Sequence, residues 1–513
     1  MNKKTSYAAL FDDYQDTSFI KKIENYALWT IPSAFPENYQ YQSKQNQEIE
    51  HDYQSIGAIL VNSLATKLTG SLFPANQSFF RIEFTDDMSK KLQAMKGYDE
   101  KTAKASLIDI ETQACRRIFL NASYAQLVQM LRYLIITGNA LLKRENAGVT
   151  VYSLRNYSLL RDNSGTVLDI IIKECVAFGS LPEDVRAIIG GEYSRDEFDD
   201  VTIYTRVKRE FIDTGSSGKR PRSKWVVTQE INNVAVGKPS SYPERLCPYI
   251  PVGWNLVNGD SYCRGHVEDH AGDFAKLSDL SRALTLYQLD ACKVVNLVKP
   301  GSTVDLDSLA EAETGEWVQA DPDAVGKHEG GEYQKLQVLS NEVQSIFQRL
   351  SQAFMYQGNV RDAERVTAEE IRYNAQEADR TLGGVYSQLA EGIHLPLAYV
   401  LSAEVESMLI VAFANSEIEL QVLTGLAALG RTADVQSLIQ AANVIVAVVP
   451  ALKQVSQRFD TELIIDKILQ SHGLNPKDWM LDEQALAAEQ EANQMAAQQL
   501  DPLAQQQALQ GVA

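Results

Sequence analysis

Two histidines four residues apart are the side chains whose spacing best fits chemistry at a metal ion. His266 and His270 lie on one face of a predicted helix, with Glu268 and Asp269 between them. This spacing can hold a zinc ion, but zinc sites in proteins take three or four protein ligands. No third ligand is evident in the sequence. We therefore expect solvated or salt-bridged histidines, and we predict neither a metal nor a cofactor.

Short catalytic motifs are absent from the sequence. It contains no GxxxxGK[ST] phosphate-binding loop, so the chain is not itself an ATP-driven motor. It also contains no GxSxG or HExxH motif, and no pair of carboxylates has a spacing that marks acid–base catalysis. The glycine pairs Gly190-Gly191 and Gly383-Gly384 lack the third glycine and the strand–loop–helix context of a nucleotide site. We therefore predict that the chain is not an enzyme.

Composition and charge limit the class of protein. The 513 residues carry a formal net charge of −19, whereas DNA-binding proteins that read sequence usually have a basic face. The chain therefore avoids nucleic acid or handles it without gripping it, because each phosphate neutralised by a fixed cation adds binding energy. Five widely spaced cysteines without a CxxC pair suit a reduced compartment. The polar N-terminus lacks the apolar core of a signal peptide, so we expect the chain to stay in the cytoplasm.

The first part of the chain predicts helices and one strand. An apolar residue recurs every fourth position at Ile56, Leu60, Leu64 and Leu68, which is one face of a helix. A strand is expected at FFRIEF (79–84). Two helices are expected within 100–143, and the second of these ends near Gly138-Asn139.

Residues 140–260 are predicted to be rich in β-structure. A strand at 167–172 follows a turn, and the alternating segments 202–209 and 225–230 flank a hairpin loop at 215–224. Four basic side chains are assigned to that loop, namely Lys219, Arg220, Arg222 and Lys224. They form either a solvated loop or a contact for an acidic partner or DNA phosphate.

Two narrow apolar stripes predict a pair of long helices. Both advance in alternating steps of three and four residues, which is typical of helices packed on other helices. The first stripe consists of Leu277, Leu280, Leu284, Tyr287, Ala291, Val294 and Val298, and the second of Leu336, Leu339, Val343, Ile346, Leu350 and Ala353. Narrow stripes leave the other helix faces polar. Between them, the acidic, glycine-containing segment 299–335 is expected to protrude and to hold short strands such as 316–319.

The last third of the chain predicts further helices. A polar break at 358–366 precedes a helix that starts with the capping box Thr367–Glu370. That helix has a gap at Gly383-Gly384 and continues toward Pro396. Residues 400–480 are expected to be helical, and the Gln/Ala-rich residues 484–513 form a tail that is helical or disordered.

Eight short segments occur in the same order as in the portal proteins, or head-to-tail connectors, of short-tailed double-stranded DNA phages. They are IPSAFP (31–36), SLFP (71–74), GNALL (138–142), AFGSLPEDVR (177–186), CPYIPV (247–252), LSQAFM (350–355), RVTAEEIRY (365–373) and TLGGVYS (381–387). None of them is a catalytic motif, but all eight in order are hard to obtain by chance. The chain therefore resembles the podovirus portal family, and an α+β, mainly helical, ring-forming fold is expected.

The resemblance implies a ring, usually of twelve subunits, with parts called wing, stem, clip and crown. By position, these parts are the wing (1–265), the first stem helix (266–298), the clip (299–335), the second stem helix (336–357), the channel loop (358–366), the long wing helix (367–415), the crown (416–483) and the tail (484–513).

The resemblance also implies which residues meet DNA or partners. Channel-loop candidates are Arg361, Asp362, Glu364 and Arg365; basic stem candidates are Lys276, Arg282, Lys293 and Arg349; clip docking candidates are Asp305, Asp307, Glu311, Glu313, Glu316 and Trp317. The loop's net charge is near zero, which suits weak, reversible contact. For the basic residues, a salt bridge between subunits or a solvated face remains the alternative, and Arg349 is a candidate for an acid of the next subunit.

The implied function is that of a portal subunit at the capsid vertex. The ring would pass double-stranded DNA without reading its sequence during packaging and ejection, and it would help to nucleate the capsid. Implied partners are other copies of the chain, the large terminase subunit, a tail adaptor protein, the major capsid and scaffold proteins and internal core proteins, with no membrane. The implied location is the virion, with the host cytoplasm during assembly. The alternative is a helical scaffold protein without a DNA channel.

Overall fold

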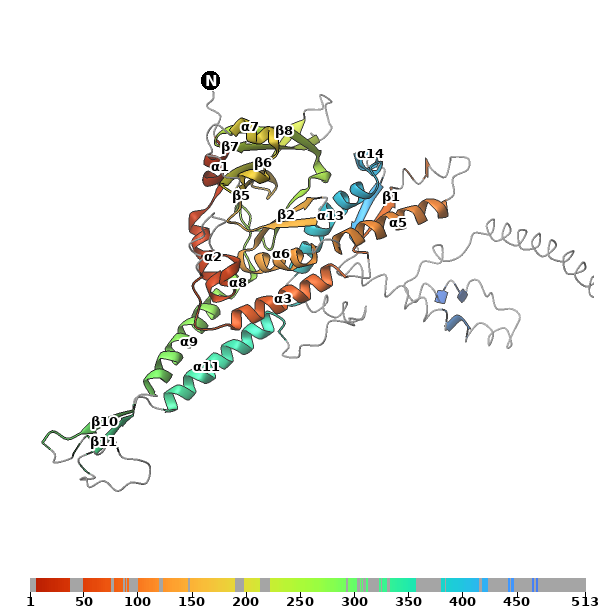
Figure 1. Cartoon of the computed structure of the whole chain (residues 1–513). Coiled ribbons are helices and arrows are strands. Elements are labelled where there is room, and N and C mark those ends of the chain that lie inside the picture. The colour runs from red at the N-terminus through yellow and green to blue at the C-terminus, as the bar shows by residue number, and fades with distance from the viewer. Residues whose placement is uncertain are drawn as a thin grey trace, which may run out of the picture. The chain divides into compact units, whose positions relative to one another are not determined.

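The computed structural model describes most of the first 422 residues. The described ranges are 6–36, 49–74, 78–85, 100–119, 123–145, 148–189, 198–212, 222–291, 294–301, 325–329, 333–356, 380–382, 384–414 and 418–422, with scattered short groups elsewhere. The chain divides into two compact units, Met1–Gly425 and Leu426–Ala513. Every element named below belongs to the first unit (Figure 1). The predicted tail, 484–513, lies outside the described residues, as does nearly all of 423–483.

Three helices open the chain: α1 (Tyr7–Tyr14), α2 (Thr17–Trp29) and α3 (Ile56–Leu72), with the 3-10 turn η1 (Pro32–Ala34) after α2. The Asp16 carboxylate caps α2 by accepting from the backbone N–H groups of Ser18 and Phe19. Helix α3 confirms the predicted apolar face, because three of the four residues that predicted it, Leu60, Leu64 and Leu68, are fully buried. At Gly57 a Cβ atom would lie 2.1 Å from the Trp29 carbonyl oxygen, so only glycine fits there.

A three-stranded sheet forms the centre of this unit. Helices α5 (Glu100–Phe119) and α6 (Ser123–Thr137) confirm the predicted pair, and Gly138 ends α6 at φ +76°. The next residues, Asn139–Glu145, form strand β2, which agrees with the predicted end of the helix near Gly138-Asn139 and with the β-rich segment expected from residue 140. Strand β2 lies between β3 (Gly148–Tyr152) and β9 (Tyr249–Gly253). Strand β2 is the central strand of the three, and its first four residues are all buried.

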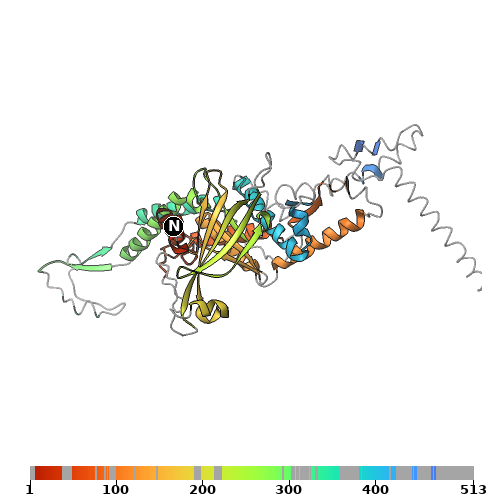
Figure 2. The same ribbon diagram turned by 90° about the horizontal axis from the view of Figure 1, so that it is seen from above.

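A second, five-stranded antiparallel sheet has the strand order β4-β5-β6-β7-β8. Figure 2 shows this sheet in yellow and yellow-green. Its strands are β4 (Tyr157–Arg161), β5 (Val167–Ala177), β6 (Asp200–Ile212), β7 (Arg222–Ile231) and β8 (Val234–Pro243), accompanied by η2 (Phe178–Ser180), α7 (Glu183–Ile189) and η3 (Glu244–Leu246). The predicted β6–β7 hairpin is confirmed. Its strands are longer than expected, so Arg222 and Lys224 belong to β7 and not to the loop.

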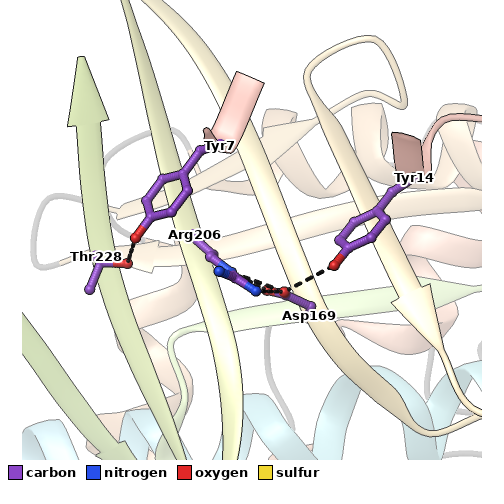
Figure 3. A network of polar contacts seen from close by, with 5 residues as sticks. All are labelled: Tyr7, Tyr14, Asp169, Arg206 and Thr228. Carbon is purple, nitrogen blue, oxygen red and sulfur yellow. Dashed lines mark hydrogen bonds and ion pairs between the residues drawn. The ribbon is translucent and has the colours of Figure 1, made fainter. Parts of the chain in front are cut away.

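Helix α1 is fixed to this sheet by a polar network (Figure 3). The guanidinium of Arg206 donates to both carboxylate oxygens of Asp169, a residue that is almost fully buried. The hydroxyl of Tyr14 donates to the same carboxylate at 3.3 Å. At the other end of the helix, the hydroxyls of Tyr7 and Thr228 lie 2.8 Å apart. The bond from Tyr14 to the carboxylate is charge-assisted and therefore stronger than a neutral one. Together with the contact between Tyr7 and Thr228 it holds the helix against β5 and β7, while the pair of Arg206 and Asp169 joins β6 to β5.

Residues predicted to begin a helical crown instead complete a small sheet. Strand β1 (Phe80–Phe84), which confirms the predicted strand at 79–84, pairs antiparallel with β12 (Ile418–Val422). Helices α13 (Val385–Val405) and α14 (Leu409–Ala414) precede β12, and both contact it. Helix α13 begins after Gly384 at φ +86°, which confirms the predicted gap. The alternating burial of Ile418 and Leu420 suits a strand, and its partner lies more than 330 residues away.

A helix pair and a hairpin complete the first unit. The short helix α8 (His266–Asp269) leads into α9 (Ala271–Ala291), and α11 (Tyr333–Ala353) runs beside α9 (Figure 1). Between them, β10 (Val294–Val298) pairs with β11 (Val325–Glu329). The prediction of one helix through Val298 is therefore wrong: it ends at Ala291. The valine-rich run suits both patterns, and pairing with β11 selects the strand. No helix among the described residues has the length and apolarity to cross a membrane.

Candidate functional site: the α9–α11 helix pair and its hairpin

An apolar seam holds α9 against α11. Leu277 on α9 and both Ile346 and Leu350 on α11 have no exposed surface, and Leu280 and Val343 pack against the same core while partly exposed. These residues belong to the two predicted stripes, so the prediction of two helices packed along matching seams is confirmed. Burial decreases along α9 towards the hairpin, where Leu286 is 53% exposed and Leu289 is 61% exposed.

Two ion pairs cross between the helices beside this seam. Arg349 donates to the Asp273 carboxylate at 2.8 Å, and Lys276 pairs with Glu342. The hydrogen bond from Arg349 lowers the pKa of Asp273, and the hydrogen bond from Lys276 lowers the pKa of Glu342. The four side chains are between 31% and 50% exposed. Such pairs contribute little to stability, and both lie within one chain.

The two histidines pack against each other at the base of the helix pair, with His270 partly exposed. His266 is buried, and its Nε2–H donates to the Ala353 carbonyl oxygen at 3.1 Å. Its ring lies 5.6 Å from Trp254, 5.0 Å from His270 and 4.7 Å from Phe354. Burial lowers the pKa of His266 to about 4. The expectation of solvated or salt-bridged histidines is therefore wrong for His266, because aromatic residues distant in sequence enclose it.

A lysine from α3 caps the end of α11. Lys67 Nζ donates to the Met355 carbonyl oxygen at 2.5 Å. Met355 itself has a φ of +54°, and the Tyr356 N–H donates to the Ser351 carbonyl at 2.7 Å. This is the left-handed end of a helix C-terminus, formed here without glycine. Together with His266, it fixes the direction in which the chain leaves α11. Among the described residues, no group of three His, Cys, Asp or Glu side chains is placed to hold a metal ion.

The basic stem candidates do not form a common surface. Lys276 and Arg349 are engaged in the two ion pairs, so the structure gives Arg349 a partner within its own chain. Arg282 is exposed, with its guanidinium 5.8 Å from the centre of the Tyr53 ring. Lys293 lies outside the described residues.

The clip candidates follow β10, in the segment that connects it to β11. Asp305, Asp307 and Glu311 are exposed. The other clip candidates, Glu313, Glu316 and Trp317, lie outside the described residues, as does the predicted strand at 316–319.

The remaining candidates fall mostly outside the described residues. These are Arg361, Asp362, Glu364 and Arg365 of the channel loop, the capping box Thr367–Glu370, and Lys219 and Arg220 of the wing loop. Lys224 is described, and its Nζ lies 3.5 Å from Glu210 on the neighbouring strand.

One face of α11 was missed by the sequence reasoning. Its exposed residues at steps of four, three, four and four are all carboxamides. They are Gln337, Asn341, Gln344, Gln348 and Gln352. At 100° per residue these side chains lie opposite the apolar seam. The regular spacing of these amides in the sequence could have indicated that they share one side of a helix. The structure adds that this side is exposed and faces away from the seam. We call these five residues the amide face.

The fold and the helix pair describe an α+β assembly subunit whose notable surface is a protruding pair of helices. Residues 6–480 match the profile of the family described as bacteriophage head to tail connecting protein, and the chain belongs to this family. It is 38% identical over 499 residues to the portal protein of Pseudomonas phage phiKMV, covering 97% of this chain and 96% of that protein. Its role is therefore structural, as a portal protein at the head–tail connection of the virion, and it is not an enzyme.

Further relatives and neighbours extend this comparison. The portal protein of Enterobacteria phage T3 is 34% identical, with 85% of this chain and 80% of that protein covered; for Escherichia phage T7 the values are 32%, 81% and 77%. The neck of an empty gene transfer agent particle computed with C6 symmetry matches at 11% identity and a TM-score of 0.41, over 83% of this chain and 91% of that chain. The native neck computed with C12 symmetry matches at 10% identity and a TM-score of 0.35, over 82% and 90%.

Proposed function

We propose that twelve copies of the chain form a ring whose stem, built from α9 and α11, encloses a channel for double-stranded DNA. The observation that carries this proposal is the helix pair. Each helix has 21 residues, about 30 Å at 1.5 Å per residue. The pair buries only its narrow seam and leaves Leu286, Leu289 and Val338 at least half exposed. Burial of these side chains against neighbouring copies would offset the cost of assembly.

The acidity of the chain suits movement of DNA through such a ring. Every charge is repeated around the axis, so one carboxylate that faces the channel becomes a ring of negative charge. Repulsion from phosphate would keep the duplex centred, and few fixed cations mean little binding energy to undo at each step. Arg361 and Arg365 of the channel loop, balanced by Asp362 and Glu364, would supply brief contacts.

The remaining parts would serve as docking surfaces. In this proposal the exposed acids of the clip bind the large terminase subunit during packaging and a tail adaptor afterwards. The wing, including its basic loop, meets the capsid and scaffold proteins, and the crown meets internal core proteins. Assembly takes place in the host cytoplasm.

Phage complementation tests this function. A phage that lacks its own copy of the gene is supplied with variants in trans, and packaged DNA per particle is measured beside the mass of the purified assembly. Replacing 305–323 by a neutral linker should leave a ring-sized assembly but abolish packaging. Normal packaging with that variant would contradict the clip assignment.

Two further variants examine the channel and the tail. Arg361→Glu together with Arg365→Glu should reduce DNA passage or retention, and a wild-type titre would count against the channel role. Truncation after residue 483 should leave the assembly intact. A wild-type assembly without an axial opening would instead support a helical scaffold protein without a DNA channel.

A further inference from the structure

We infer that the amide face of α11 is the surface along which the DNA duplex moves within the stem. The inference deepens the proposed function and rests on it. The face extends over 16 residues from Gln337 to Gln352, about 24 Å of helix. All five residues that define it are exposed, and none is charged or apolar.

Charges on the described part of α11 are turned away from this face. Glu342 and Arg349 both lie towards α9, where they pair with Lys276 and Asp273. The two ion pairs therefore do more than align the helices. They remove from the amide face the acid and the base that α11 would otherwise offer to a passing phosphate.

Carboxamides are suited to a surface that must contact DNA without holding it. Asn and Gln side chains both donate and accept hydrogen bonds, and they are among the groups that contact phosphate in protein–DNA complexes. They release no counterions when they do so. A lysine or arginine does, and each neutralised phosphate changes the salt dependence of affinity by about −0.9 in the log–log slope. An amide ring would therefore give contacts that water readily replaces.

Packing between two copies of the chain is the other use for an exposed helix face, and the residues disfavour it. Burying five amides would require a hydrogen-bonding partner for each donor and acceptor. The side chains suited to a dry interface are elsewhere: Leu286 and Leu289 on α9, and Val338, which is 67% exposed, at the side of the amide face. None of these three exposed apolar side chains is among the five residues that define the amide face.

Lysine substitution on this face tests the inference. The variant Gln344→Lys with Gln348→Lys should assemble like the wild type, retain DNA with a steeper salt dependence and package at least tenfold less DNA per particle. Gln288→Lys, an exposed amide of α9 outside the face, is the matched control and should package normally. The neutral variant Gln344→Ala with Gln348→Ala should package within about twofold of the wild type.

Several results would overturn the inference. Normal packaging by the double lysine variant would show that the face does not meet DNA. Failure of that variant to assemble, while Gln288→Lys assembles, would show that the face lies between copies. A loss in the alanine variant as large as in the lysine variant would show that neutrality is not the property that matters. Failure of the wild type itself to pass DNA would contradict the proposed function instead.

Discussion

Truncation of one seam leucine tests what holds the helix pair together. Leu350 is a residue of α11 that has no exposed surface and packs in the hydrophobic core of the unit. Leu350→Ala removes buried carbon atoms and leaves a cavity, which typically costs about 2–5 kcal/mol. At 1.36 kcal/mol for each factor of ten, the lower figure corresponds to about 30-fold more frequent opening. The seam, and not the ion pairs, is expected to supply most of the stability.

Hydrogen exchange of the backbone amides of α9 and α11, measured by mass spectrometry on the intact assembly, reports this opening directly. Leu350→Ala should accelerate exchange in both helices by about 30-fold or more. Arg349→Gln, which removes an exposed ion pair, should leave exchange close to the wild type. Ser340→Ala, at an exposed position of the same helix, is the control. If Arg349→Gln opened the pair as far as Leu350→Ala, the reasoning about the seam would be refuted.

Three further predictions concern the body of the first unit. Asp169→Asn should lower the free energy of unfolding by about 2–3 kcal/mol, because Arg206 loses its carboxylate while largely buried; a melting temperature like that of the wild type would contradict this. His266 has a folded pKa of about 4, below its unfolded value near 6.5, so the unfolded chain binds the proton first and stability falls as pH drops from about 6.5 to 4. His266→Gln should flatten this dependence of the melting temperature on pH, and an unchanged slope would exclude His266 as its source. Gly57→Ala should destabilise the protein because its Cβ has no room, whereas Gly70→Ala in the same helix has nothing within 4 Å and should stabilise it by about 0.5–1 kcal/mol; equal effects would refute the close approach.

Periodicity in the sequence predicted the elements whose neighbours are near in the chain. The spacing of apolar residues located α3, α6 and the two helices of the pair, and the turn signals located the β6–β7 hairpin. Periodicity failed to predict a strand where the strand that pairs with it is distant in the sequence, or where the apolar pattern fits a helix as well as a strand. Val294 and Val298 fit a heptad and a strand equally well, and only pairing with β11 decides between them. Strand β12 depends on β1 in the same way.

The candidate site was predictable in outline but not in the roles of its residues. The resemblance placed the basic residues Lys276 and Arg349 on the stem helices, yet their partners across the pair depend on how α9 and α11 align. The enclosure of His266 requires Trp254 and Phe354 to meet it in space. The sequence can thus predict that a side chain lies on a polar face. Whether that side chain then binds a partner residue or faces solvent depends on how the helices and strands pack.

A cryo-electron microscopy reconstruction of the purified, assembled chain viewed along its symmetry axis tests the central claim most directly. The prediction is a ring in which α9 and α11 of every copy surround an axial opening, with Gln344 and Gln348 directed into it. A closed particle without an axial opening, or a solitary chain with both helices covered on every side, would contradict the account.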